Sequence, residues 1–154
     1  KCSRNEAAVC AGARGSFAMI LVDSNVLMYA AGAPHRHREA SLALLRRIAA
    51  AKVEAVLDAE VLQEVLHRYR AIGRWQTGRD LYDRARHIFP VVIPVTAEIL
   101  DIARSLLDAH PRLMARDALH AAVCLQAGLE AICSYDRDFD RIKDLKRFEP
   151  PQVS

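Results

Sequence analysis

The chain has 154 residues, of which 52% are hydrophobic and 27% are charged, and its formal net charge is +3. This length fits one domain with a sizeable core, and the composition excludes a disordered or low-complexity chain. No apolar run approaches the roughly 20 residues of a membrane helix, and so small a net charge does not by itself argue for a nucleic-acid partner.

Residues 1–18 differ from everything that follows. They are rich in Ala, Gly and Ser and have neither a helical nor a strand period, whereas Met19 begins an apolar run. We expect this segment to be a leader that is disordered, or that was added in expression or produced by a misassigned start. A targeting peptide is the alternative. A secretory signal is disfavoured because the segment lacks a 7–15-residue apolar stretch. Residues 19–150 are expected to form a single domain, and residues 151–154 a tail.

From Met19 onward, strand and helix patterns alternate. Apolar runs predict strands at 19–22, 54–58, 91–95 and 131–135, with a short edge strand at 146–148. Apolar residues at helical spacing predict helices at 24–31, 38–51, 59–72, 75–89, 97–109 and 115–127. This alternation is typical of a mostly parallel sheet between two helical layers, that is, a three-layer α/β/α sandwich.

Local signals mark several boundaries. Pro94 lacks an amide donor, so its strand is expected to end there or to lie at a sheet edge. Thr96 is placed to cap the helix that follows it, and Gly128 to end the helix before it. Cys124 and Cys133 lie among apolar neighbours and are expected to be buried thiols in a reducing compartment.

Four acidic residues are the most informative feature. Asp23 and Asp136 follow strands, Asp117 opens a helix and Glu64 lies inside another. A carboxylate just beyond a buried strand lies at the sheet edge where α/β proteins bind ligands. Four like charges in one cleft are costly unless a cation neutralises them, so the pattern indicates a Mg²⁺ or Mn²⁺ site. Without metal, at least one of these carboxyl groups should have a raised pKa.

Each acidic position also has an ordinary structural interpretation. Asp23 could cap the following helix, Asp117 would be favoured by the helix dipole, and Asp136 could belong to a plain turn. Glu64 could form an exposed ion pair with Arg68, and a helical wheel places Glu64 on the flank of its helix, outside the buried stripe. The joint placement of the four residues is what favours a metal site.

Four segments together resemble the PIN-domain family. In chain order they are 19–27 (MILVDSNVL), 61–65 (VLQEV), 116–122 (RDALHAA) and 134–139 (SYDRDF). They occur in the family's order, and the resemblance covers nearly all of residues 19–150. It is closest to the compact VapC-like toxins of toxin–antitoxin pairs.

The resemblance implies an α/β/α endoribonuclease that depends on Mg²⁺ or Mn²⁺. Such an enzyme hydrolyses RNA with metal-activated water and leaves a 5′-phosphate and a 3′-hydroxyl. The implied catalytic and metal-binding residues are Asp23, Glu64, Asp117 and Asp136. Asn25 and Ser134 match small polar positions that support the site, and Asp138 is a further carboxylate near it. Glu60 departs from the pattern, because many relatives carry a small polar residue there.

Partners and location follow from the same resemblance. It implies an RNA substrate, a cognate antitoxin, a homodimer and a cytoplasmic location, with no membrane contact. Arg36, Arg38 and Arg68 are candidates for RNA contacts, although solvated helix faces explain them equally well. An aromatic content of 6% gives no sign of a base-stacking platform. His120, one turn after Asp117, is expected to serve helix packing or to support the site indirectly.

Two other classes of function remain open. One is a catalytically inert PIN module that binds RNA or a protein. The other is an α/β phosphohydrolase or a receiver, since these also collect aspartates at strand ends. The chain lacks the Asp-x-Asp-x-Thr motif of haloacid-dehalogenase-like phosphatases, because Ser24 and Asn25 follow Asp23, and it has no clear lysine after a late strand for a receiver.

Overall fold

The computed structural model describes residues 19–153, so the expected leader at 1–18 lies outside the described part of the chain. A parallel sheet with the strand order β3-β2-β1-β4-β5 forms its centre. The strands are β1 (Ile20–Val22), β2 (Ala55–Asp58), β3 (Val92–Ile93), β4 (Ala131–Cys133) and β5 (Lys146–Phe148). The helices are α1 (Ser24–Ala31), α2 (Arg38–Ala49), α3 (Ala59–Ala71), α4 (Trp75–Ile88), α5 (Ala97–Ala109) and α6 (Ala115–Ala127), and the 3-10 turns are η1 (Arg137–Arg141) and η2 (Pro150–Gln152).

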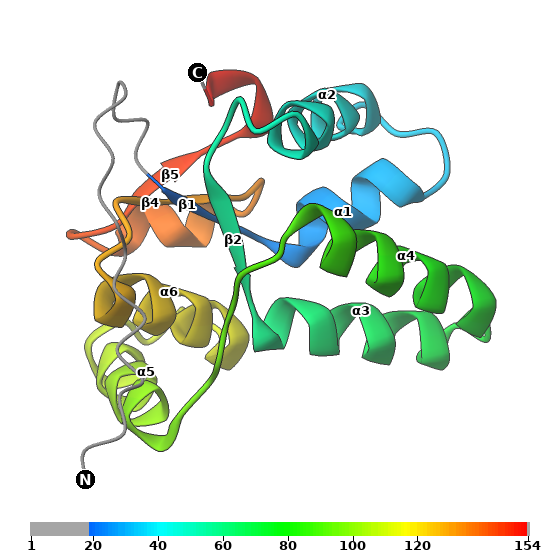
Figure 1. Ribbon diagram of the computed structural model, residues 1–154. Helices are drawn as coiled ribbons and strands as arrows, with labels where there is room; N and C mark the ends of the chain where they lie inside the picture. The colour runs from blue at the N-terminus through cyan, green and yellow to red at the C-terminus, as the bar shows by residue number, and fades with distance from the viewer. Residues whose placement is uncertain (1–18, 154) are drawn as a thin grey trace, which may run out of the picture.

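The sheet separates two hydrophobic cores. In β1, Ile20 and Val22 point into one core and Leu21 into the other, as the two-residue period of a strand requires. The first core is completed by α1 to α4, and the second by α5, α6 and η1. Figure 1 shows α5 and α6 on one side of the sheet and the remaining helices on the other. The predicted three-layer α/β/α sandwich is confirmed, and every strand pairing in it is parallel.

Several predicted boundaries are off by one or two residues, for local reasons. The second helix stops at Ala49 because Ala51 adopts a left-handed φ of 54°, which no helix can continue. The strand before Pro94 is shorter than predicted, and β3 is an edge strand, as the proline indicates. The fourth strand ends at Cys133 because the chain turns there into the loop that carries Ser134 and Asp136.

The predicted caps and thiols are confirmed. The Thr96 hydroxyl accepts a hydrogen bond from the Ile99 amide at 3.4 Å, and Gly128 ends α6 with a left-handed φ of 64°. Cys124 and Cys133 are buried and free. Within residues 19–153, no helix combines the length and the hydrophobicity needed to cross a bilayer.

Candidate metal centre

The predicted site residues gather at the carboxyl ends of the two central strands. Asp23 directly follows β1, and Ser134 directly follows β4, its neighbour in the sheet. After β1 the chain proceeds to β2 on one side, and it returns later to β4 on the other side. Open parallel sheets bind ligands at such a reversal of strand order.

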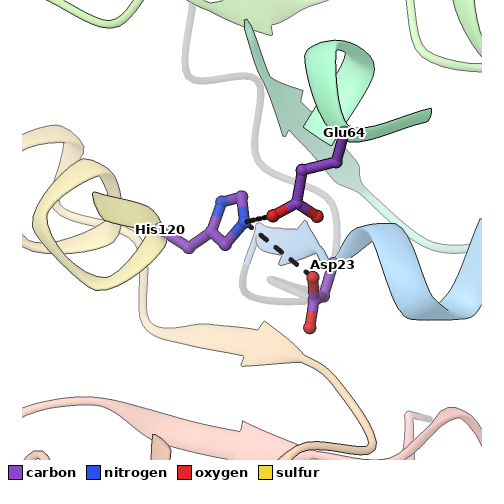
Figure 2. Close-up of side chains that lie close together, drawn as sticks. All are labelled: Asp23, Glu64 and His120. Atoms are coloured by element: carbon purple, nitrogen blue, oxygen red, sulfur yellow. Dashed lines mark ion pairs between the residues drawn. The ribbon is translucent and has the colours of Figure 1, made fainter. Parts of the chain in front are cut away.

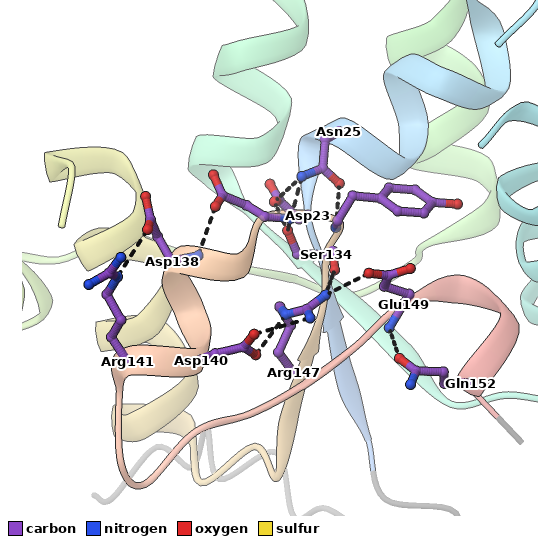
Figure 3. A network of polar contacts seen from close by, with 11 residues as sticks. Asp23, Asn25, Ser134, Asp138, Asp140, Arg141, Arg147, Glu149 and Gln152 are labelled. Atoms are coloured by element: carbon purple, nitrogen blue, oxygen red, sulfur yellow. Dashed lines mark hydrogen bonds and ion pairs between the residues drawn. The ribbon is translucent and has the colours of Figure 1, made fainter. Parts of the chain in front are cut away.

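The Asp23 carboxylate is held by polar neighbours. Its Oδ2 accepts hydrogen bonds from Asn25 Nδ2 at 2.7 Å and from the Ser134 hydroxyl (Figure 3). Asn25 Nδ2 also lies 2.9 Å from the Ser134 oxygen, which accepts the Asp136 amide. Asp23 occupies the N-cap position of α1 but makes no side-chain capping bond. The capping interpretation therefore does not account for this carboxylate.

Glu64 is only 7% exposed, so the prediction that it lies outside the buried surface of its helix is wrong. The helical wheel considered α3 alone, whereas α1 and α6 also pack on the flank that carries Glu64. Ser24, on α1, donates a hydrogen bond to Glu64 Oε2. Arg116, on α6, lies 3.3 Å from Glu64 Oε1. The ion pair of Glu64 is thus formed with Arg116 and not with Arg68.

Five carboxylate side chains and the imidazole of His120 form two neighbouring groups. The inner group, Asp23, Glu64 and His120, is buried, and the outer group, Asp117, Asp136 and Asp138, is half-buried. Within each group, one ligand atom from every residue lies within 4.8 Å of the others, close enough to share a metal ion. Asp138 is therefore as close to a shared metal position as Asp117 and Asp136, although only a supporting role was expected for it.

Burial, together with the charges of neighbouring carboxylates, raises the pKa of several carboxyl groups of the site. Burial, followed by the charges of Asp136, Asp23 and Glu64, raises the pKa of Asp117 to about 6. Burial also raises the pKa of Asp23. Glu60, one turn before Glu64, has a raised pKa because it is partly buried and faces the charge of Glu64. The expectation that clustered carboxylates resist ionising together is confirmed, and such a cluster fits a divalent cation.

Two buried residues of the site, His120 and Asp58, were not predicted in their present roles. Asp58 was not singled out in the sequence, and His120 was expected to serve helix packing or to support the site indirectly. His120 is 1% exposed, and its Nδ1 lies 2.7 Å from Oδ2 of Asp58, which is fully buried at the end of β2. Its Nε2 faces the gap between Asp23 and Glu64 (Figure 2). Burial opposes the imidazolium, but the carboxylates of Asp58, Glu64 and Asp23 raise the pKa of His120 well above its ordinary value. His120 is thus part of the inner group itself.

Arg147, on β5, ties the loop after β4 to the C-terminal segment. Its guanidinium contacts both carboxylate oxygens of Asp140, at 2.8 and 3.2 Å, and lies 3.3 Å from Glu149. It also donates to the Ser134 carbonyl at 3.0 Å. Figure 3 shows this side chain between the two segments. Arg147 therefore holds the Ser134 backbone in place, and the hydroxyl of Ser134 donates to the Asp23 carboxylate.

A group of four rings lies next to the site. His37 stacks on Tyr135 at 3.9 Å, and Tyr29 stacks on His35 at 4.3 Å. Tyr29 and Tyr135 meet edge to face at 5.3 Å. The low aromatic content gave no sign of this group, because its members come from segments about a hundred residues apart. Tyr135 lies between Ser134 and Asp136, and its amide donates to Asn25 Oδ1 at 3.4 Å, so the loop that carries this ring also carries part of the acidic site.

The three arginines considered for RNA contacts lie at different places. Arg36 is exposed beside the rings, where its Nε donates to His37 Nε2 at 3.3 Å. Arg38 begins α2 and pairs with Glu39 at 3.4 Å. Arg68 is exposed on α3, one turn beyond Glu64. Arg36 and Arg38 flank His37 and so border the ring group.

The fold and the site define a parallel α/β domain with an acidic centre suited to a divalent cation. The PIN domain family model matches residues 20–145, and the chain belongs to that family.

The chain is similar to Ribonuclease VapC13 of Mycobacterium tuberculosis, with 40% identity over 129 residues, 84% of this chain and 98% of that relative. Its fold is similar to VapBC2 from Rickettsia felis bound to a promoter DNA fragment, with a TM-score of 0.67, 15% identity and coverage of 85% of this chain and 99% of that chain. It is also similar to a toxin–antitoxin complex from Klebsiella pneumoniae, with a TM-score of 0.58, 18% identity and coverage of 84% and 98%. At these identities the solved structures bear on the fold alone.

The raised pKa of Asp117 has a consequence for stability. The folded protein retains this proton up to about pH 6, whereas a free carboxyl has a pKa of 3.8. The stability that the protonated group contributes is therefore lost as the pH rises through about 6. Without metal, the melting temperature of Asp117→Asn relative to wild type should rise between pH 5 and pH 7.5. The gain should be on the order of 1 kcal/mol, or about 2–4 °C, since the group is half-exposed and screened.

Millimolar Mg²⁺ or Mn²⁺ should change the difference in melting temperature between Asp117→Asn and wild type. A cation that binds only the folded protein stabilises it, so wild type should gain more than Asp117→Asn at pH 7.5. The control is Asp83→Asn, an exposed position on α4, whose melting temperature should follow wild type under every condition. Melting temperatures that ignore both pH and metal in all three proteins would contradict the assignment.

Proposed function

We propose that this protein is an endoribonuclease that requires Mg²⁺ or Mn²⁺ and acts as a VapC-like toxin. One observation carries the proposal: acidic side chains that follow β1 and β4, or lie on α3 and α6, form two groups whose charges act on one another at one end of the sheet. Membership of the PIN family and 40% identity to a VapC ribonuclease support RNA as the substrate.

The site residues are proposed to act as follows. Asp23 and Asp117 are the principal metal ligands, directly or through water. Glu64 and Asp136 are further metal ligands that complete the negative charge and position the attacking water. Asn25 and Ser134 hold the Asp23 carboxylate in place by hydrogen bonds. A bound divalent cation would lower the pKa of water and neutralise the phosphate. Carboxylate oxygens are the ligands that suit Mg²⁺ and Mn²⁺.

The ring group supports a path for single-stranded RNA. Bases of any sequence stack on aromatic faces, and Arg side chains contact phosphates. Tyr29, His35, His37 and Tyr135 provide the faces, with Arg36 and Arg38 beside them. We place a nucleotide next to the scissile phosphate on these rings. Arg68 is a separate candidate on the α3 side of the site.

The phosphohydrolase alternative is less well supported. A haloacid-dehalogenase-like phosphatase would use the first aspartate of an Asp-x-Asp-x-Thr motif as its nucleophile, whereas Asp23 is followed by Ser24 and Asn25. An inert module has no use for the complete set of carboxylates, whose clustering is costly: burial, followed by the charges of Asp136, Asp23 and Glu64, raises the pKa of Asp117 to about 6.

We further propose a small antitoxin protein as partner, and a homodimer. Membership of the PIN family and 40% identity to a VapC ribonuclease support the first, because the sequence resembles the VapC-like toxins of toxin–antitoxin pairs. Exposed apolar side chains at the turn between α3 and α4, Ile72 and Trp75, offer surface for such contacts. We also propose a cytoplasmic location, which is consistent with an RNA substrate.

The test is an incubation of the purified protein with a mixed RNA pool and Mn²⁺, with and without EDTA. We expect RNA fragments with 5′-phosphate ends, and no cleavage in EDTA. Release of phosphate from p-nitrophenyl phosphate without RNA cleavage would favour the phosphohydrolase. RNA binding without cleavage under every metal condition would favour the inert module.

A further inference from the structure

His120 has one ring nitrogen fixed and the other without a partner. Its Nδ1 lies 2.7 Å from Asp58 Oδ2. Its Nε2 is buried and has no hydrogen-bond partner within the described residues 19–153. This atom lies 3.7 Å from Glu64 Oε1 and 4.0 Å from Asp23 Oδ1, and Figure 2 shows it directed at both carboxylates.

We propose that His120 Nε2 is a direct ligand of a divalent cation held by Asp23 and Glu64, and that Asp58 orients the imidazole for it. The proposal rests on the proposed function and adds a nitrogen ligand to a set of carboxylates.

Asp58 is placed to act as an orienting residue. Its Oδ1 accepts the Val61 amide at 2.8 Å and so caps α3, which leaves Oδ2 for His120. A carboxylate on Nδ1 keeps the proton on that nitrogen, and the lone pair of the neutral ring is then on Nε2. Histidines that bind metals commonly have such a carboxylate on the other nitrogen, because it fixes the ring and makes it more basic.

The separations fit one ion. Two ligands on opposite sides of a cation at about 2.1 Å lie about 4.2 Å apart. The distances from Nε2 to the two carboxylate oxygens, 3.7 and 4.0 Å, are both shorter than this. A histidine that served packing alone would not leave a buried nitrogen unpaired and directed at two carboxylates, because an unpaired buried polar atom is costly.

The competing role is a permanent imidazolium that neutralises Asp23 and Glu64 without contacting any metal. The two roles differ in metal preference. A nitrogen ligand suits Mn²⁺ better than Mg²⁺. The outer group of Asp117, Asp136 and Asp138 offers oxygen alone and suits either ion. The inner group should therefore prefer Mn²⁺.

The test is pulsed electron paramagnetic resonance of Mn²⁺ bound to the full-length protein. Wild type should show the coupling of a directly coordinated ¹⁴N, and growth with ¹⁵N-histidine should convert it to ¹⁵N. His120→Gln should lose the coupling and should bind Mn²⁺ at least about tenfold more weakly. The matched control is His67→Gln on the exposed face of α3, which should keep both.

The ¹⁵N experiment on wild type decides the matter even if His120→Gln fails to fold. Mn²⁺ bound without nitrogen coupling, coupling that persists in folded His120→Gln, or no Mn²⁺ binding at all would each overturn the inference. Metal-dependent RNA cleavage without nitrogen coupling would overturn the inference and leave the proposed function standing. Nitrogen coupling without RNA cleavage would support the metal site and contradict the nuclease.

Discussion

Replacing Asp23 with asparagine should reduce Mn²⁺-dependent RNA cleavage at least about 100-fold. The substitution preserves the size of the side chain and an oxygen that can accept from Ser134, but it removes the negative charge that a metal ligand requires. The fold should be retained, because burial already raises the pKa of Asp23 and a neutral amide avoids the cost of a buried charge. Initial cleavage rates at saturating Mn²⁺, with circular dichroism of both proteins, provide the measurement.

The control for this experiment is Asp108→Asn. Asp108 lies on α5 with a side chain that is 66% exposed, and its one ion pair among residues 19–153 is with Arg104. Its variant should cleave RNA at the wild-type rate. A folded Asp23→Asn protein that keeps activity within tenfold of wild type would show that this carboxylate is not a metal ligand.

Replacing Gly78 with alanine should destabilise the protein by about 1–3 kcal/mol, although alanine is ordinarily the better helix former by about 1 kcal/mol. Gly78 lies where α4 contacts α3, and a Cβ there would come 2.4 Å from the Cβ of Tyr69. The conflicting atom is next to the backbone, so the two helices would have to move apart. The clash therefore outweighs the gain in helix propensity.

The measurement is thermal unfolding, in which each kcal/mol corresponds to about 2–4 °C for a protein of this size. Gln76→Ala, at an exposed position of the same helix, is the control and should shift the melting temperature by less than about 2 °C. A Gly78→Ala protein as stable as wild type would mean that α3 and α4 do not pack this closely.

Local patterns were sufficient to predict the fold. Strand and helix periods, together with stops such as Pro94 and Gly128, depend on neighbours within one or two turns. The positions of Asp23 and Asp136 after two strands were also predictable, because parallel strands that lie side by side end at the same edge of the sheet. Ser134 lay inside the predicted strand and was indicated only by the family resemblance. The same rule applied to β2 would have found Asp58, which ends that strand.

Features that depend on packing between distant elements were not predictable. The burial of Glu64 needs α1 and α6, and neither enters a helical wheel of α3. His120 has the sequence context of a packing residue, and only the fold places Asp58 on one side of its ring and two carboxylates on the other. The contact of Arg147 with the Ser134 carbonyl likewise forms only because β5 pairs with β4.

The central claim is that the carboxylates of Asp23, Glu64, Asp117 and Asp136 hold a divalent cation. Anomalous diffraction from crystals of the active protein grown with Mn²⁺ tests it most directly. The account predicts an anomalous peak about 2.1–2.2 Å from a carboxylate oxygen of Asp23, with further contacts from Glu64 or Asp117. An active protein whose crystals contain Mn²⁺ elsewhere and none among these residues would contradict it.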